Sequence, residues 1–168
     1  MKLKNICIMG TLRSGKTLVS RALNIHPYIS VQVEPYFFFF KICRNIFYRD
    51  ILKDDIDPES PISSGFANFS GYTNLFNEKF NNLQFKDSDI KELIKKTTWQ
   101  QEYEDCKRAP LIVPMLHSLR PGSAKEVLNK LMKILAVSYQ KENLQYIGIS
   151  EGWCDEFIAP LTTDLHYK

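Results

Sequence analysis

Two hydrophobic periodicities alternate along this chain of 168 residues. Short runs that are apolar throughout, or at every second position, are typical of strands and lie at 6–9, 29–33, 111–113 and 146–149. Stretches with apolar residues at every third or fourth position are typical of helices and lie at 18–25, 36–48, 87–106, 123–135 and 153–165. Strands that alternate with helices predict one α/β domain over 1–168, a three-layer sandwich with a mainly parallel sheet.

Local signals sharpen this outline. His26-Pro27 ends the first helix, because the residue before a proline is pushed out of helical geometry. Ser123 and Glu126 have capping-box spacing and open the helix that follows them. The run Phe37–Phe40 covers more than one helix face, so its helix is predicted to be buried on most sides, and Trp99 is expected on the apolar face of the 87–106 helix. From about 50 to 86 the chain is polar and irregular with short helical pieces, which we interpret as a lid or acceptor-side excursion.

The loop between the first strand and the first helix carries the strongest chemical signal. It reads G-T-L-R-S-G-K-T and matches the phosphate-cradling P-loop pattern G-x-x-x-x-G-K-T in the strand–loop–helix context which that pattern requires. Glycines permit backbone angles that turn several N–H groups towards one anion, and the helix N-terminus adds a positive dipole end. The predicted site for a polyphosphate or phosphosulfate consists of Gly10, Arg13, Ser14, Gly15, Lys16 and Thr17.

Composition narrows the classes of partner. The apolar content of 44% and the charged content of 24% are ordinary for a soluble globular protein, and the net charge of +3 without Lys or Arg blocks gives no indication of a nucleic-acid partner. Four widely spaced cysteines favour reduced thiols, and His117 and His166 lack partners at ligand spacing, so no metal site is predicted. No apolar segment is long enough to span a membrane, and we expect a cytoplasmic setting.

The first forty residues resemble the opening of sulfotransferases of the Golgi, tyrosylprotein and bacterial type. The resemblance rests on R-S-G at 13–15, on His26-Pro27 and on Glu34-Pro35 at the intervals found in that family. The segment from Ile147 to Ile158 also resembles a strand-to-tryptophan stretch of some bacterial members, so the match covers about a third of the chain. It implies a P-loop fold of the sulfotransferase type, 3′-phosphoadenosine 5′-phosphosulfate as the donor, and an acceptor that carries a hydroxyl group.

The same resemblance implies roles for two residues. Arg13 would neutralise charge on the bridging oxygen of the donor as it leaves. Glu34, at the position of a glutamate that acts as general base in tyrosylprotein sulfotransferases, would take the proton of the acceptor hydroxyl, which suits a carboxylate of raised pKa. Glu34 has a second interpretation, as a carboxylate that satisfies N–H groups at the start of a helix, and it stays open. For His26 we favour local hydrogen bonds over a role in the site.

The sequence departs from the sulfotransferase pattern at two points, and each leaves another function possible. Lys16 replaces the usual threonine or serine and completes a kinase-type loop, so ATP with magnesium is an alternative ligand and a small-molecule kinase an alternative enzyme. The family's arginine-and-serine segment for the 3′-phosphate has no convincing copy in the sequence. We therefore expect an N-terminal part of a longer protein or an incomplete donor site, with little preference for the 3′-phosphate; a truncated, non-catalytic binding module is the third interpretation.

Overall fold

The computed structural model describes residues 3–10, 14–33, 36–62, 70–104, 106–137 and 139–151. Within these ranges the chain alternates helices and strands as a mixed α/β protein. The predictions made for Arg13, for Glu34 and for the helix at 153–165 lie outside the described residues.

A small parallel sheet organises the end of the molecule that holds the loop motif. Its three strands are β1 (Lys4–Met9), β2 (Ile29–Val33) and β5 (Tyr146–Glu151), in the spatial order β1–β5–β2. Met9 pairs with Glu151, and Val33 pairs with Ser150, so the carboxyl ends of all three strands meet at one edge. The mainly parallel α/β sheet predicted from the alternation is confirmed, although its central strand is the last one in sequence among the described residues.

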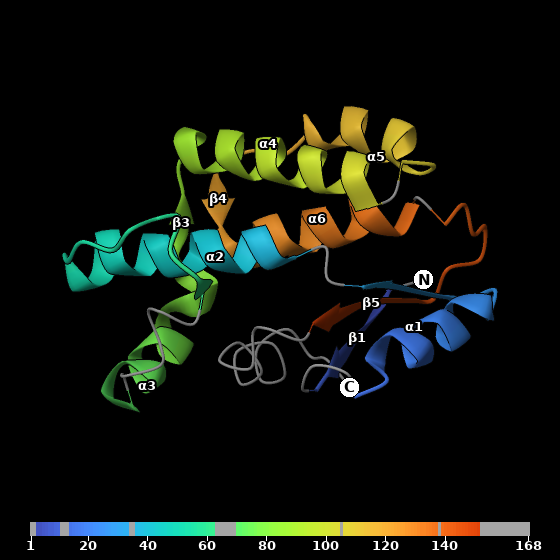
Figure 1. Ribbon diagram of the computed structural model, residues 1–168, viewed down its shortest axis with the longest axis horizontal. Coiled ribbons are helices and arrows are strands. Elements are labelled where there is room, and N and C mark those ends of the chain that lie inside the picture. Colours follow the sequence, from blue (N-terminus) through green and yellow to red (C-terminus); the bar gives the residue numbers. More distant parts are fainter. Residues whose placement is uncertain are drawn as a thin grey trace.

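Helices cover both faces of this sheet. In Figure 1, α1 (Lys16–Ile25) lies below the strands and α6 (Ala124–Val137) lies above them. The side chain of Gln32 on β2 donates a hydrogen bond to the carbonyl oxygen of Leu135 at 2.9 Å and so fastens α6 to its face. Ser123 opens α6 as predicted: its hydroxyl accepts the N–H of Glu126, whose carboxylate accepts the N–H of Ser123.

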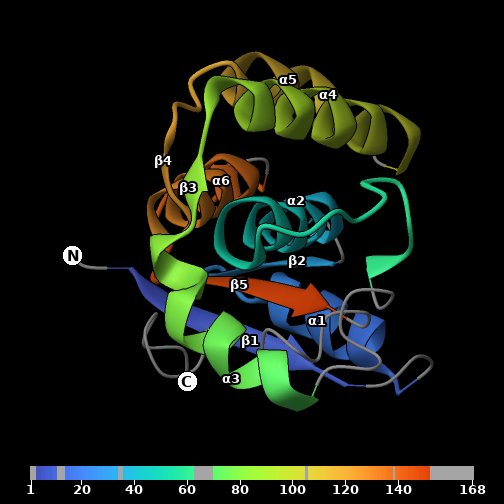
Figure 2. The ribbon, with the colours of Figure 1, turned by 90° about the vertical axis from the view of Figure 1, so that its left-hand side faces the viewer.

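Further helices extend the structure away from the sheet. Figure 2 shows α2 (Phe37–Ile46) beside α6, with α4 (Asp87–Glu104) and α5 (Ala109–Leu116) stacked above them. The remaining elements join these helices: η1 (Phe47–Leu52) continues α2 as a π-helix, α3 (Ser70–Lys79) leads into the short 3₁₀ helix η3 (Phe80–Asn82), and β3 (Gln84–Phe85) pairs antiparallel with β4 (Gly122–Ser123).

Aromatic side chains fill the core between these helices. Phe39 stacks on Phe85 at a centroid distance of 5.4 Å, and Phe47 meets the edge of Phe76 at 5.1 Å. Phe39 and Phe40 are fully buried, so the prediction for the phenylalanine run is confirmed. The excursion at 50–86 contains the predicted helical pieces, and it also contributes Phe76 and Phe85 to the core, which its polar composition conceals.

Two sequence predictions in this helical layer are wrong. The apolar run 111–113 is part of α5 and not a strand. Three apolar residues fit either structure, and the deciding signal is Pro110, whose fixed backbone angle suits the first turn of a helix. Trp99 does not face the core but is 58% exposed, since α4 buries Ile90 and Leu93 on its other side.

Two polar side chains fix α1 against the edge strand β2. The amide of Asn24 accepts the N–H of Val31 at 2.8 Å and donates to its carbonyl oxygen at 2.6 Å, as a neighbouring strand would. Lys141 donates to the carbonyl oxygens of Asn24, His26 and Ile29, and partial burial lowers the pKa of its ammonium group. The carbonyl groups of Asn24 and His26 lie at the end of α1, where a helix lacks internal donors and favours a cation, and that of Ile29 lies at the start of β2. The start of α1 is thereby held at the opposite end, beside β1 and β5.

Candidate functional site

The candidate site lies where the strands end. The chain leaves β1 for α1 on one face of the sheet and leaves β2 for α2 on the other face (Figures 1 and 2). The helices that follow β1 and β2 therefore lie on opposite faces of the sheet, and the central strand β5 ends between Met9 and Val33. In open α/β sheets, ligands bind at the carboxyl edge where successive connections diverge in this way.

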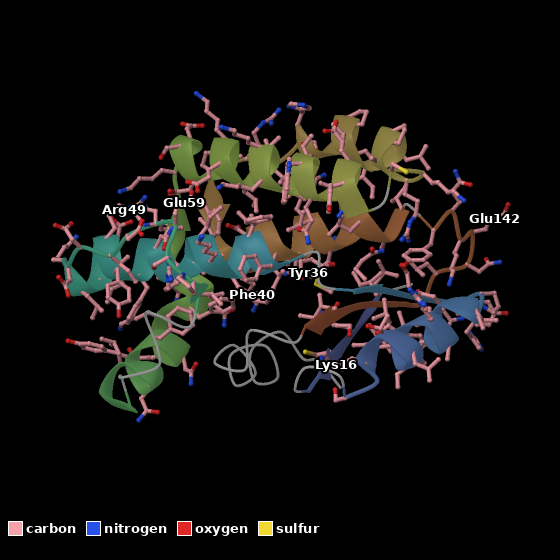
Figure 3. The ribbon with its side chains drawn as sticks, viewed as in Figure 1. Lys16, Tyr36, Phe40, Arg49, Glu59 and Glu142 are labelled. Atoms are coloured by element: carbon pink, nitrogen blue, oxygen red, sulfur yellow. The ribbon has the colours of Figure 1, made fainter. Side chains whose placement is uncertain are left out.

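The described part of the loop is folded back on itself. A methyl group built on Gly10 would lie 2.8 Å from the hydroxyl of Ser14 and 3.5 Å from the Cγ and Cδ atoms of Lys16. Both side chains therefore return towards the end of β1. Lys16 keeps only 8% of its surface exposed, although it stands at the first turn of a helix (Figure 3). Its aliphatic stem is packed against the loop, so its ammonium group is held near the sheet edge.

Gly15 starts the helix in a conformation that favours glycine. Its φ of 84° lies in the left-handed region, and its carbonyl oxygen accepts the N–H groups of Leu18 and Val19 at 3.0 and 3.1 Å. The N–H groups of Lys16 and Thr17 precede these first intrahelical bonds and have no acceptor within the helix. Together with the positive end of the helix dipole, this arrangement suits an anion.

We predict that Gly15→Ala destabilises the chain by about 1–2 kcal/mol, because a Cβ atom is unfavourable in the left-handed region. The space around Gly15 is open, so the cost comes from the backbone and not from a clash. Asparagine tolerates this conformation better than alanine, and Gly15→Asn should therefore cost less. Urea denaturation of the three proteins measures both differences. Equal stability of Gly15→Ala and the parent would show that this backbone conformation is not required.

The structure brings part of the predicted residue set together. One tight turn of the loop brings four of them close together: Gly10, Ser14, Gly15 and Lys16. The side chain of Thr17, the next residue, is exposed. Arg13 and Glu34 lie outside the described residues. Ser14, which follows Arg13 in the sequence, adjoins the helix start, and Val33, which precedes Glu34, ends β2. β2 and β1 are separated by one strand, so their ends lie about 10 Å apart at the usual strand spacing.

Ser150 is a further candidate at this edge which the sequence motifs did not indicate. It is fully buried one residue before the end of the central strand, and its hydroxyl has no hydrogen-bond partner among the described residues. A buried hydroxyl without a partner costs about 1–3 kcal/mol. The sequence offered one indication of Ser150: it lies at the end of an apolar run that was predicted as a strand. That strand is the central one of the parallel sheet.

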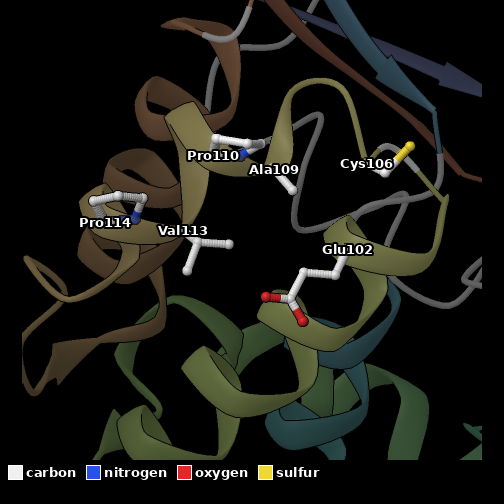
Figure 4. A pocket seen from close by; sticks show the side chains of 6 residues that line it. All are labelled: Glu102, Cys106, Ala109, Pro110, Val113 and Pro114. Atoms are coloured by element: carbon white, nitrogen blue, oxygen red, sulfur yellow. The ribbon is translucent and has the colours of Figure 1, made fainter.

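Two pockets lined by described residues lie elsewhere. One, of about 450 Å³, lies between α4 and α5 and is lined by Glu102, Cys106, Ala109, Pro110, Val113 and Pro114 (Figure 4). Another, of about 470 Å³, lies beside Arg49, which binds Asp89 through two hydrogen bonds and Asp50 at 2.8 Å. Hydrogen bonds from Arg49 and Lys86 lower the pKa of Asp50 to about 2, so these charges already neutralise one another.

The described part of the chain shows neither a metal-ligand cluster nor a membrane-spanning helix. No group of three or more His, Cys, Asp or Glu side chains there is placed to hold a metal ion. None of the helices described has the length and apolar character needed to cross a bilayer.

The chain was compared with protein-family models, with curated proteins and with solved structures. No match was found.

Proposed function

We propose that this chain is a sulfotransferase-like domain of the P-loop class. It would transfer a sulfuryl group from 3′-phosphoadenosine 5′-phosphosulfate to a hydroxyl group of an acceptor. The observation that carries the proposal is the position of the motif: G-x-x-R-S-G-K-T occupies the connection from β1 to α1 at the carboxyl edge of a parallel sheet. The residues beyond it, His26-Pro27 and Glu34-Pro35, add the likeness to sulfotransferases.

The proposed chemistry assigns one task to each group. The N–H groups at the start of α1, with the ammonium group of Lys16, hold the 5′-phosphate of the donor. Glu34 accepts the proton of the acceptor hydroxyl, and the oxygen attacks sulfur as the bond between sulfur and the bridging phosphate oxygen breaks. The negative charge that develops on this oxygen is stabilised by Arg13. The products are a sulfate ester and 3′-phosphoadenosine 5′-phosphate.

A kinase is the second candidate, favoured by Lys16 and Thr17. In P-loop kinases a lysine at this place reaches the β- and γ-phosphates of ATP, and the hydroxyl after it binds magnesium. The strand between β1 and β2 ends in Ser150-Glu151 and offers no aspartate at the place where such enzymes hold the ion. A binding module without catalysis is the third candidate, and it differs from the others in turnover alone.

Product formation separates these candidates. The chain is incubated with 3′-phosphoadenosine 5′-phosphosulfate or with ATP and magnesium, each with phenol, N-acetylglucosamine, a tyrosine peptide and tetragalacturonic acid as acceptors. We expect sulfate transfer to at least one acceptor, and a loss of nucleotide affinity of about tenfold or more in Lys16→Met, since a hydrogen bond to a charged group contributes about 1.5–3 kcal/mol. Arg21→Met, on the exposed side of α1, is the control and should change neither. Phosphate transfer without sulfate transfer would support the kinase instead.

A further inference from the structure

The exposed side of α4 carries two cations and two aromatic rings in one line. Lys91, Lys95, Trp99 and Tyr103 follow one another at intervals of four residues, and all four are exposed. We call this set the α4 stripe. Successive members lie about 6 Å further along the helix and about 40° around it, so the stripe extends over about 18 Å. Trp99 and Tyr103 are 58% and 79% exposed, which is unusual for such large apolar rings.

The aromatic half of the stripe is a rigid surface. The rings of Trp99 and Tyr103 are parallel within 5°, with their centroids 5.7 Å apart. Trp99 is supported from beneath by the edge of Phe38 at 6.3 Å, and Phe38 is covered in turn by the ammonium group of Lys96. Two aligned rings that cost little entropy to hold in place are well suited to stack on a flat ring of a ligand.

The stripe is also connected to the candidate site. Phe38 lies in the first turn of α2, five residues after Val33 at the end of β2. The contact of Phe38 with Trp99 therefore links the carboxyl edge of the sheet to the surface of α4. A chain-like ligand bound along the stripe would have its aromatic-bound end nearest Phe38, at the start of α2.

The charges around the stripe are mixed. Lys91 and Lys95 form no salt bridge within the described ranges, whereas Lys96 is paired with Glu59 at 3.0 Å. Glu92 and Glu102 flank the stripe on the same helix. Unpaired ammonium groups attract anionic groups, and carboxylates accept hydrogen bonds from hydroxyl groups. The matching ligand is anionic, rich in hydroxyl groups and built of rings.

We propose that the α4 stripe binds an acidic oligosaccharide whose hydroxyl groups serve as the sulfuryl acceptor. The acceptor role rests on the proposed function, whereas the binding itself does not require it. Sugar rings stack on Trp99 and Tyr103, and carboxylate groups of the sugar pair with Lys91 and Lys95. A DNA strand fits less well, because it has no free hydroxyl groups along its chain that could donate to the carboxylates of Glu92 and Glu102.

The probe for the test is tetragalacturonic acid, with maltotetraose as the neutral match. Binding to the full chain is followed by calorimetry and by the indole N–H signal of Trp99 in NMR, assigned with Trp99→Phe. We expect tetragalacturonic acid to move this signal and to bind at least about tenfold more tightly than maltotetraose. The double variants Lys91→Ala/Lys95→Ala and Trp99→Ala/Tyr103→Ala should each lose about tenfold or more in affinity. Lys130→Ala/Lys133→Ala on α6 and Ile25→Ala on α1, all exposed, are the controls and should retain it.

Three results would overturn the proposal: no movement of the Trp99 signal, equal losses in the α6 control, or tighter binding of a ten-residue oligothymidine or of phosphatidylserine vesicles. Affinity for 3′-phosphoadenosine 5′-phosphate is measured on the same samples. Sugar binding without nucleotide binding would support the α4 binding site and contradict the proposed sulfotransferase activity. Nucleotide binding without sugar binding would contradict the α4 binding site and leave the proposed nucleotide site supported.

Discussion

Glu34→Gln should reduce turnover of the active protein by about 10²–10⁴-fold, which is the usual contribution of a general base. Glutamine keeps the size of the side chain and its reach for hydrogen bonds, but it cannot accept the proton of the acceptor hydroxyl. Glu34 follows Val33 in the sequence, and Val33 ends β2 at the carboxyl edge of the sheet, where β1 also ends. Turnover, nucleotide affinity and melting temperature are measured on the variant and on the parent.

The matched control for this change is Glu142→Gln. Glu142 is exposed in the connection before β5, at the side of the molecule away from Lys16 (Figure 3). Its replacement removes the same charge and should leave turnover near that of the parent. Normal turnover of Glu34→Gln would exclude Glu34 from the chemistry, and a large loss of stability would make it structural, as the helix-start interpretation requires.

Arg44→Met should be among the most destabilising single changes in the chain, with a loss of about 3 kcal/mol or more. Arg44 on α2 is fully buried, and it takes part in none of the salt bridges among the described residues. Its guanidinium group donates to the side chain of Asn45 and to carbonyl oxygens between Asp57 and Pro61. Methionine fills similar space but leaves at least two of these oxygens without a donor, at about 1–3 kcal/mol each.

Burial lowers the pKa of Arg44, so keeping this charge inside the protein is itself unfavourable. The hydrogen bonds to the segment at 57–61 must outweigh that cost. Urea denaturation of Arg44→Met is compared with that of Lys133→Met, a change on the exposed side of α6 that should stay within about 0.5 kcal/mol. If Arg44→Met matched the parent, water or a rearranged loop would satisfy the carbonyl groups.

Elements with strong local signals were predicted correctly from the sequence. β1, α1, β2, α6 and β5 each had a clear period and a recognisable boundary, such as His26-Pro27 or the capping box at Ser123. α5 was missed because an apolar run of three residues has no period, so Pro110 had to decide. The order of the strands was not predictable in the same way, since it depends on where the chain returns after more than a hundred residues.

The residues of interest likewise fall into two groups: those that a local sequence motif predicts and those that only the fold reveals. The loop from Gly10 to Thr17 is local in sequence, and its glycines and lysine identify it as a P-loop motif directly. Ser150, the buried Arg44 and the α4 stripe depend on which residues the fold brings together or leaves exposed, and single-residue patterns carry little of that information. Trp99 illustrates the limit: an aromatic residue on a helix predicts burial, and here its exposure is what suggests a ligand.

Calorimetric titration with 3′-phosphoadenosine 5′-phosphate in the absence of any divalent metal tests the central claim most directly. The nucleotide carries the 5′-phosphate that the start of α1 should hold, and adenosine 5′-phosphate and ATP with magnesium are titrated in parallel. We predict metal-free binding of both adenosine phosphates, with little difference between them, and a loss of about tenfold or more in Lys16→Met. Absence of binding by the parent to either adenosine phosphate, or binding of ATP with magnesium alone, would contradict the proposed sulfotransferase site.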